Sequence, residues 1–261
     1  MSIIEASILG LVQGLTEFLP VSSSGHLVII RHFFGFSLEN TLSFDVLLHL
    51  ATLFAILICF KGDIKRIFTD FKTEGFSSKS SNLLWAIVVG TIPAIIFGYF
   101  FADTIEETFR NPIYIAYALI AGSILFFIAD RLSSGRGGIT ILKGFVIGLF
   151  QSLAFISGFS RSGSTISGGL IVGLSREESI KFSFLLGIPI IFGAGLKTFM
   201  ELSKTGDLIE LFRLESMISF VIALFSGIWA VKFLVRYLSK NSFTIFIIYR
   251  LILATSILFL V

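Results

Sequence analysis

The sequence predicts an all-α polytopic membrane protein with six transmembrane helices and two re-entrant helix–loop–helix units, arranged as an inverted-topology repeat. Of its 261 residues, 55% are hydrophobic and 14% are charged, whereas a soluble domain carries about 25% charged residues. Two apolar segments are interrupted by serine- and glycine-rich loops, and an offset of 138 residues brings one onto the other. We expect residues 1–261 to form a single integral membrane domain, with repeat 1 over about residues 1–130 and repeat 2 over about 131–261.

The predicted elements follow from apolar length and from the positions of breaks. Residues 3–36 are interrupted at 20–25, and neither arm is long enough to cross about 30 Å of hydrocarbon, which takes about 20 helical residues. We therefore expect a re-entrant unit there and a second one at residues 139–174, which are interrupted in the same way. Residues 61 to about 82 are charged and are expected to form a loop. The six spans are expected at about 44–60, 83–101, 113–129, 178–199, 217–238 and 243–260.

The repeat predicts where a site would lie. The aligned identities are Gly10, Leu11, Gln13, Leu15, Ser22, Ser24 and Gly25 with Gly148, Leu149, Gln151, Leu153, Ser160, Ser162 and Gly163. Three spans follow each broken segment, so the second copy is inverted relative to the first. Inverted repeats with broken helices place a site near the bilayer midplane, where the two loops meet. We expect one cavity to join Glu17 and His26 to Arg161.

Charge predicts orientation and excludes one class of partner. Lysine and arginine are more numerous in the loops after the first, third and fifth spans and around the second re-entrant unit. The positive-inside rule places that face in the cytoplasm and both termini outside. We expect the site to lie near the midplane and to open to the outer face. The net charge of +3 is spread over loops, and no basic run suits nucleic acid. The single cysteine, Cys59, excludes an intramolecular disulfide.

The second loop, residues 157–165, holds an arginine among hydroxyls and glycines. A guanidinium at bilayer depth is unfavourable by about 2.5–3.5 kcal/mol on insertion scales, so Arg161 needs a partner or a water-filled cavity. Hydroxyls, glycine N–H groups and a helix start are the donors that hold phosphate. These donors favour phosphate binding over snorkelling of Arg161 at a helix end. The phosphate-binding candidates are Ser160, Ser162, Gly163 and Thr165.

The first loop supplies an acid, a histidine and three serines. Gln13 and Glu17 are four residues apart and share a helix face, and a carboxylate there is either a functional group or an interfacial charge. His26 could be a base, a nucleophile, a proton donor or a structural histidine. The serines at 22–24 could be phosphate ligands, helix caps or a nucleophile activated by His26.

This inventory suits phosphoryl transfer, in which positioning and charge stabilisation do most of the work. A divalent cation would be held by Glu17, hydroxyls, water and the substrate's own phosphates, as Mg²⁺ usually is.

Three segments resemble the undecaprenyl-pyrophosphate phosphatases associated with bacitracin resistance: QGLTEFLPVSSSGH at 13–26, GFSRSGST at 158–165 and FSFLLGIP at 182–189. With the spacing of the broken segments, the resemblance covers essentially the whole chain. It implies a plasma-membrane enzyme of six spans and two re-entrant units. That enzyme would remove the terminal phosphate of a polyprenyl diphosphate with a divalent cation, Mg²⁺ or Ca²⁺, and so recycle the carrier lipid of cell-wall synthesis.

Matched residue by residue, the resemblance implies catalytic roles for Glu17, His26, Ser23 and Arg161, with Glu17 also at the metal. The implied substrate-binding residues are Gln13, Ser22, Ser24, Ser160, Ser162, Gly163 and Thr165. Two positions depart from the pattern: Ser157 stands where proline is usual, and Gln13 is an amide that cannot replace a carboxylate as a base or as a strong metal ligand. The expected partners are the lipid diphosphate and membrane lipid, and a homodimer stays open.

A transporter or flippase for a phosphorylated lipid is the alternative, because inverted repeats with midplane anion sites are typical of transporters. Glu17 and His26 together favour the enzyme, since anion binding alone needs no general base. Four further residues lie in the predicted spans. Asp45 and His49 share a helical face and could extend the polar site or line its entry, but a structural role is favoured, because an aspartate at a helix start also interacts with the helix dipole. Lys232 and Arg250 are expected to snorkel.

Overall fold

The computed structural model describes residues 1–36, 41–75, 79–108, 111–135, 137–205 and 211–260. Within these ranges every regular element is a helix, so the predicted all-α class is confirmed. The helices are α1 (Ile3–Thr16), α2 (Ser23–Phe34), α3 (Thr41–Cys59), α4 (Lys61–Glu74), α5 (Lys79–Thr108), α6 (Pro112–Leu132), α7 (Ile141–Ser152), the 3₁₀ helix η2 (Leu153–Phe155), α8 (Arg161–Ile171), α9 (Arg176–Thr205), α10 (Leu214–Leu238) and α11 (Thr244–Leu260).

Among the described residues, four of the six predicted spans are helices long and apolar enough to cross a membrane. They are Ser81–Phe101, Pro112–Leu132, Arg176–Lys204 and Leu214–Leu238. A fifth is counted if Phe44–Cys59 and Lys61–Thr73, which meet at a bend of 68°, form one span. The helix at the sixth predicted span, α11, has 17 residues, which is short of the ~20 that cross hydrocarbon without help. The protein is therefore a membrane protein with several apolar helices.

The expected charged loop after the first span is wrong for residues 61–74, which form α4. Ile64, Ile67 and Phe71 recur at the spacing of one helix face, and Ile67 is buried. Lys61, Lys65, Arg66 and Lys72 are exposed on other faces. The sequence composition suggested a loop because these charges outweigh the apolar stripe that in fact fixes the helix.

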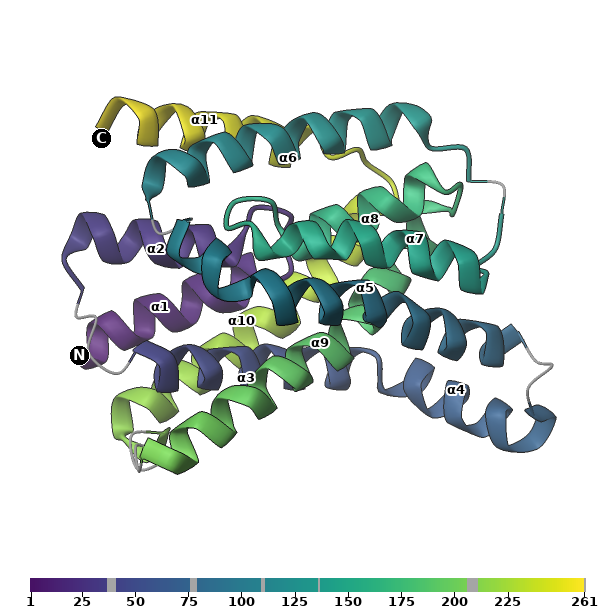
Figure 1. Ribbon diagram of the computed structural model, residues 1–261, viewed down its shortest axis with the longest axis horizontal. Helices are drawn as coiled ribbons and strands as arrows, with labels where there is room; N and C mark the ends of the chain where they lie inside the picture. Colours follow the sequence, from purple (N-terminus) through teal and green to yellow (C-terminus); the bar gives the residue numbers. More distant parts are fainter. Residues whose placement is uncertain (37–40, 76–78, 109–110, 136, 206–210, 261) are drawn as a thin grey trace.

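The helices that carry the two loops pack on partners from the opposite half of the chain. Helix α1 lies against α10, α7 lies against α5, and α6 runs beside α11 (Figure 1). Glycine permits the first two crossings, because a Cβ at Gly10 would lie 2.6 Å from Ser219 O and a Cβ at Gly148 would collide with Gly90 O. Small residues let helix backbones approach closely in this way.

The largest apolar cluster lies beside the loops, and apolar side chains also cover the outside. Phe18 packs edge-on against Phe184 with ring centroids 5.7 Å apart, and both are buried. Tyr99, Phe225 and Phe259 are among many exposed aromatic or apolar residues on the outer surface. An apolar surface of this extent suits contact with lipid rather than water.

Candidate active site

The two predicted loops begin their second helices with the same geometry. Ser22 and Ser160 are the only non-glycine residues with positive φ in the described chain, at 74° and 76°. Each side-chain oxygen caps its helix by accepting a hydrogen bond, from Gly25 N or Gly163 N, at 3.3 Å. Positive φ is rare for residues with a Cβ and persists only where surrounding contacts enforce it. The two serines are related by the 138-residue offset found in the sequence.

The loops contact each other directly. The backbone N–H of Gly158 donates to Ser22 Oγ at 2.9 Å, and Arg161 Nη2 donates to Glu17 Oε1 at 2.8 Å. Side chains of this ion pair are only 10% and 8% exposed. The predicted meeting of the loops is thus confirmed for Glu17 and Arg161, while the chemical roles of both stay predictions.

A cavity of about 200 Å³ lies where the loops meet. Its polar wall comes from the loops and from His49 and Gln151, and its apolar wall comes largely from α5, η2 and α9. The lining residues are Thr16, Glu17, Ser22, Ser23, Ser24, His49, Ala94, Gln151, Ala154, Phe155, Ser160, Arg161, Ile190, Ile191 and Ala194. A small polar chamber beside an apolar wall can receive a charged group attached to an apolar chain.

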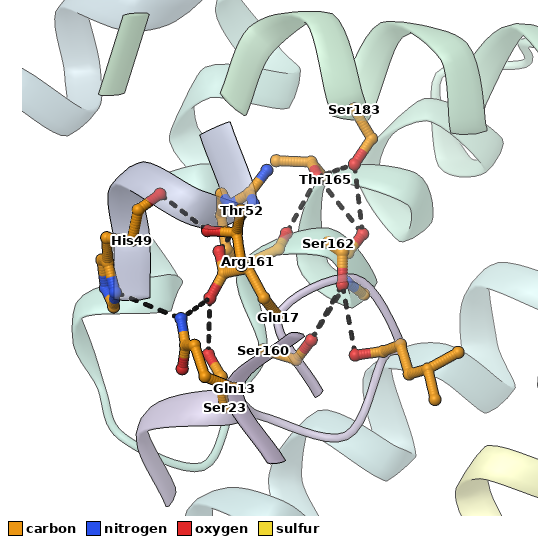
Figure 2. A network of polar contacts seen from close by, with 12 residues as sticks. Gln13, Glu17, Ser23, His49, Thr52, Ser160, Arg161, Ser162, Thr165 and Ser183 are labelled. Carbon is orange, nitrogen blue, oxygen red and sulfur yellow. Dashed lines mark hydrogen bonds and ion pairs between the residues drawn. The ribbon is translucent and has the colours of Figure 1, made fainter. Parts of the chain in front are cut away.

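Glu17 is the centre of the polar network in Figure 2. Its Oε2 atom accepts hydrogen bonds from Ser23 Oγ at 2.7 Å and from Gln13 Nε2 at 3.1 Å. Gln13 Nε2 also lies 3.1 Å from His49 Nδ1. Arg161 donates to the other carboxylate oxygen, Oε1. Both oxygens of Glu17 therefore accept hydrogen bonds, and the one from Arg161 comes from a charged donor. The network fixes Ser23 against the one carboxylate of the cavity lining.

Behind the second loop, the remaining predicted residues form a packed hydroxyl cluster. Ser160 Oγ and Ser162 Oγ are 3.2 Å apart, and Thr165 Oγ1 lies 2.6 Å from Ser183 Oγ. Ser162, Gly163 and Thr165 are buried and do not line the cavity. Of the second-loop residues predicted to bind phosphate, Ser160 and Arg161 therefore reach the cavity. Ser183 was not identified from the sequence.

His26 is not among the residues that line the cavity. Its Nδ1 lies 2.7 Å from Ser22 O, and its Nε2 lies 2.7 Å from the Tyr249 hydroxyl. The two rings stack with their centroids 5.7 Å apart and their planes within 5°. Both ring nitrogens are thus occupied by groups of the protein, so His26 is not brought together with Glu17 and Arg161.

Asp45 and His49 have different surroundings in the structure. Asp45 forms an ion pair with Arg31, as a structural residue would. His49 lines the cavity, so the less favoured alternative, that it extends the polar site, describes its position. The two residues are four apart on α3, but only the more C-terminal one reaches the level of the loops.

Arg250 does not snorkel, so that prediction is wrong. The side chain is fully buried in α11 and donates to the carbonyl oxygens of Gly158 at 2.8 Å and Phe159 at 3.2 Å. It also donates to Ser123 Oγ at 3.1 Å, and its guanidinium lies 4.6 Å from the ring centroid of Phe126. A guanidinium has five N–H donors in a fixed fork and can bind several carbonyls at once. Lys232 is exposed, as expected.

A cation at this site would depend mainly on Glu17. Within the described ranges, no group of three or more His, Cys, Asp or Glu side chains is placed to hold a metal. The chemistry of the cavity lining nevertheless fits a hard cation, because Glu17 and the hydroxyls of Ser23 and Ser24 are oxygen donors. Gln13 Oε1 is buried without a described hydrogen-bond partner, but Gln13 does not line the cavity. One carboxylate, hydroxyls and substrate phosphates form a ligand set that Mg²⁺ accepts.

Comparison with known proteins identifies the chain's relatives. The family described as "Bacitracin resistance protein BacA" matches residues 6–256. The undecaprenyl-diphosphatase of Desulforudis audaxviator is 40% identical over an alignment covering 99% of this chain and 97% of the relative. Those of Elusimicrobium minutum and Methanobrevibacter smithii are 39% and 37% identical, covering 99% and 95% of this chain and 98% and 94% of the relatives. The chain therefore belongs to the bacitracin resistance protein BacA family.

Proposed function

We propose that this protein hydrolyses undecaprenyl diphosphate to the monophosphate and inorganic phosphate, and so recycles the carrier lipid of cell-wall synthesis. The observation that carries the proposal is the placement of Ser23, Glu17 and Arg161 around one cavity. Ser23 supplies a nucleophile, Glu17 supplies a base, and the Arg161 guanidinium supplies a positive charge that binds phosphate. The names of the relatives, undecaprenyl-diphosphatase, favour hydrolysis over transport of a phosphorylated lipid.

Ser23 is the attacking group in this proposal. Glu17 takes the Ser23 hydroxyl proton across their 2.7 Å contact, and Ser23 Oγ bonds to the terminal phosphorus. The bond from that phosphorus to the bridging oxygen breaks, and the lipid monophosphate leaves with the bridging oxygen. Glu17 gives its proton to the departing monophosphate. Water then attacks the phosphoserine, and Glu17 takes a proton from the water and passes it to Ser23 Oγ as the bond between Oγ and phosphorus breaks, which releases phosphate. Arg161 binds the phosphate oxygens throughout, because charge on them is what the site must stabilise.

Local contacts favour Ser23 over the other predicted nucleophiles. Ser22 Oγ already accepts hydrogen bonds from Gly25 N and Gly158 N. Ser24 lines the cavity but does not contact Glu17 among the described hydrogen bonds; its contact is with Ser22 Oγ at 3.5 Å. His26 has both nitrogens occupied and would act by fixing the Ser22 carbonyl and thus the loop.

A divalent cation, Mg²⁺ or Ca²⁺, is part of the proposal and would be held by Glu17 and serine hydroxyls of the first loop together with water and the substrate phosphates. When bound, it would neutralise phosphate charge beside Arg161.

The membrane arrangement is proposed as six spans, α3, α5, α6, α9, α10 and α11, with α1–α2 and α7–α8 as re-entrant units of an inverted repeat. The matched caps at Ser22 and Ser160 and the matched crossings of α1 on α10 and α7 on α5 support the repeat. Both termini lie at one end of the molecule and α4 lies at the other (Figure 1), which supports external termini with the basic α4 in the cytoplasm. The plasma membrane is the proposed location, with a site open to the outer face; a homodimer stays a prediction.

Phosphate release tests the proposed function. Purified protein in detergent is given undecaprenyl diphosphate with Mg²⁺, with Ca²⁺ or with chelator, for wild type, Glu17→Ala and Arg161→Ala. We expect cation-dependent release from wild type and none above background from either variant. Folded wild-type protein that releases no phosphate under any of these conditions would exclude the hydrolase.

A further inference from the structure

Gln151, near the end of α7, is a buried amide whose polar atoms make no hydrogen bond with the part of the chain that the structure describes. The side chain is 1% exposed and lines the cavity. Neither Nε2 nor Oε1 has a hydrogen-bond partner among the described residues. Buried polar groups are nearly always hydrogen-bonded, because an unpaired one loses its interaction with water without compensation. An amide left free at the wall of a cavity therefore points to a ligand that pairs with it.

The repeat explains why this amide is free. The 138-residue offset pairs Gln151 with Gln13 and Phe155 with Glu17. In the first half, Gln13 Nε2 donates to Glu17 Oε2 at 3.1 Å. In the second half the acceptor is replaced by the Phe155 ring, which also lines the cavity and offers no carboxylate. The two glutamines are thus equivalent in sequence position but differ in hydrogen bonding.

A second donor without a described partner belongs to Arg161, which also lines the cavity. Arg161 binds Glu17 through Nη2, while its Nη1 is buried with no described partner. Helices α7 and α8 therefore each supply the cavity lining with a residue that has an N–H donor to spare, one uncharged and one cationic. Ser23 and Glu17, from the first loop, line the same cavity.

We propose that Gln151 is a substrate-binding residue whose Nε2 donates to a non-bridging oxygen of the diphosphate, beside Arg161 Nη1. The inference rests on the proposed function for its substrate, but the ligand chemistry is that of any diphosphate. Gln151 holds the diphosphate on the second-repeat side, and the terminal phosphorus then faces Ser23. A neutral amide adds a hydrogen bond without adding to the charge that Arg161 and the cation supply.

Gln151→Met tests this role, because methionine keeps the length and shape of glutamine but has no N–H donor. Inorganic pyrophosphate, at fixed Mg²⁺, is the probe for binding by calorimetry. We expect its Kd to rise about tenfold or more, as for loss of a hydrogen bond to a charged group. KM for undecaprenyl diphosphate should rise by a similar factor, with a smaller change in kcat. Gln151→Glu, of the same shape but negative, should weaken binding further.

Thermal unfolding separates binding from a structural role. Because the amide has no hydrogen-bond partner among the described residues, the unfolding temperature of ligand-free Gln151→Met should equal or exceed that of wild type. The stabilisation by pyrophosphate should be reduced. The neighbouring Ser152→Ala is the control, because Ser152 Oγ contacts only the Gly148 carbonyl among the described bonds, at 3.4 Å. The Kd of this variant for pyrophosphate and its KM for undecaprenyl diphosphate should be unchanged.

An unchanged pyrophosphate Kd and KM in Gln151→Met would overturn the inference, and so would a lowered unfolding temperature of the ligand-free variant. Failure of the proposed function gives a different result: wild type binds pyrophosphate and loses that binding in Gln151→Met, but releases no phosphate from the lipid. In that case Gln151 is still assigned as a diphosphate ligand.

Discussion

Arg250 holds the two loops together, and replacing it should both destabilise the protein and reduce activity. Its guanidinium is fully buried and donates to two carbonyls of the second loop, Gly158 at 2.8 Å and Phe159 at 3.2 Å. It also reaches the first loop at Pro20 O, at 3.4 Å. Arg250→Met keeps most of the apolar stem and removes all these donors.

The magnitude follows from the carbonyls that lose their donor. A buried acceptor left without a partner destabilises by about 1–3 kcal/mol, so the two short contacts of the second loop together predict about 2–6 kcal/mol. A displacement of reacting groups by about 1 Å can reduce the rate by about 100-fold. We therefore expect phosphate release by Arg250→Met to fall at least tenfold even where the protein stays folded.

Equilibrium unfolding by detergent titration, followed by tryptophan fluorescence, measures the stability, and phosphate release measures the activity. Lys232→Met is the matched control: Lys232 is exposed on α10, and its loss should change stability by no more than about 0.5 kcal/mol. Wild-type stability and activity in Arg250→Met would refute the idea that this side chain fixes the loops.

Three further outcomes are expected. Glu17→Gln should lower kcat by about 10²–10⁴-fold, the usual contribution of a general base, and wild-type turnover would exclude that role. Tyr249→Phe removes the hydroxyl 2.7 Å from His26 Nε2 and should reduce stability by about 0.5–1.5 kcal/mol. Tyr249 and His26 do not line the cavity, so we expect them only to position the first loop. A complete loss of phosphate release in Tyr249→Phe would contradict that positioning role. Gly10→Ala, whose Cβ would lie 2.6 Å from a backbone oxygen of α10, should destabilise by about 1–3 kcal/mol in thermal unfolding. The control Gly62→Ala meets nothing within 4 Å and should be neutral or stabilising.

The arrangement of the loops was predictable because it depends on local sequence and on repetition. Polar breaks in apolar segments identify the loops, and the offset that matches Ser22 with Ser160 also predicts their meeting. The ion pair of Glu17 with Arg161 joins residues 144 positions apart. It was nevertheless foreseeable, because each is a charge in an apolar segment and needs a partner.

Other features depend on packing that sequence periodicity does not specify. Arg250 and Gly158 are 92 residues apart, and an arginine in an apolar helix is equally compatible with snorkelling and with a buried clamp. His49 reaches the cavity and Asp45 does not, although both lie on one helical face. His26 stands next to the serine run in sequence but turns toward Tyr249, 223 residues away. Each of these outcomes is fixed by which helices pack together.

Phosphate release from undecaprenyl diphosphate by Ser23→Ala tests the proposed chemistry most directly, with wild type and Ser24→Ala measured alongside. The two serines are neighbours in the cavity lining, but only Ser23 contacts Glu17 among the described hydrogen bonds. We predict release by wild type and Ser24→Ala and background release by a folded Ser23→Ala. Release by Ser23→Ala at the wild-type rate would contradict attack by Ser23.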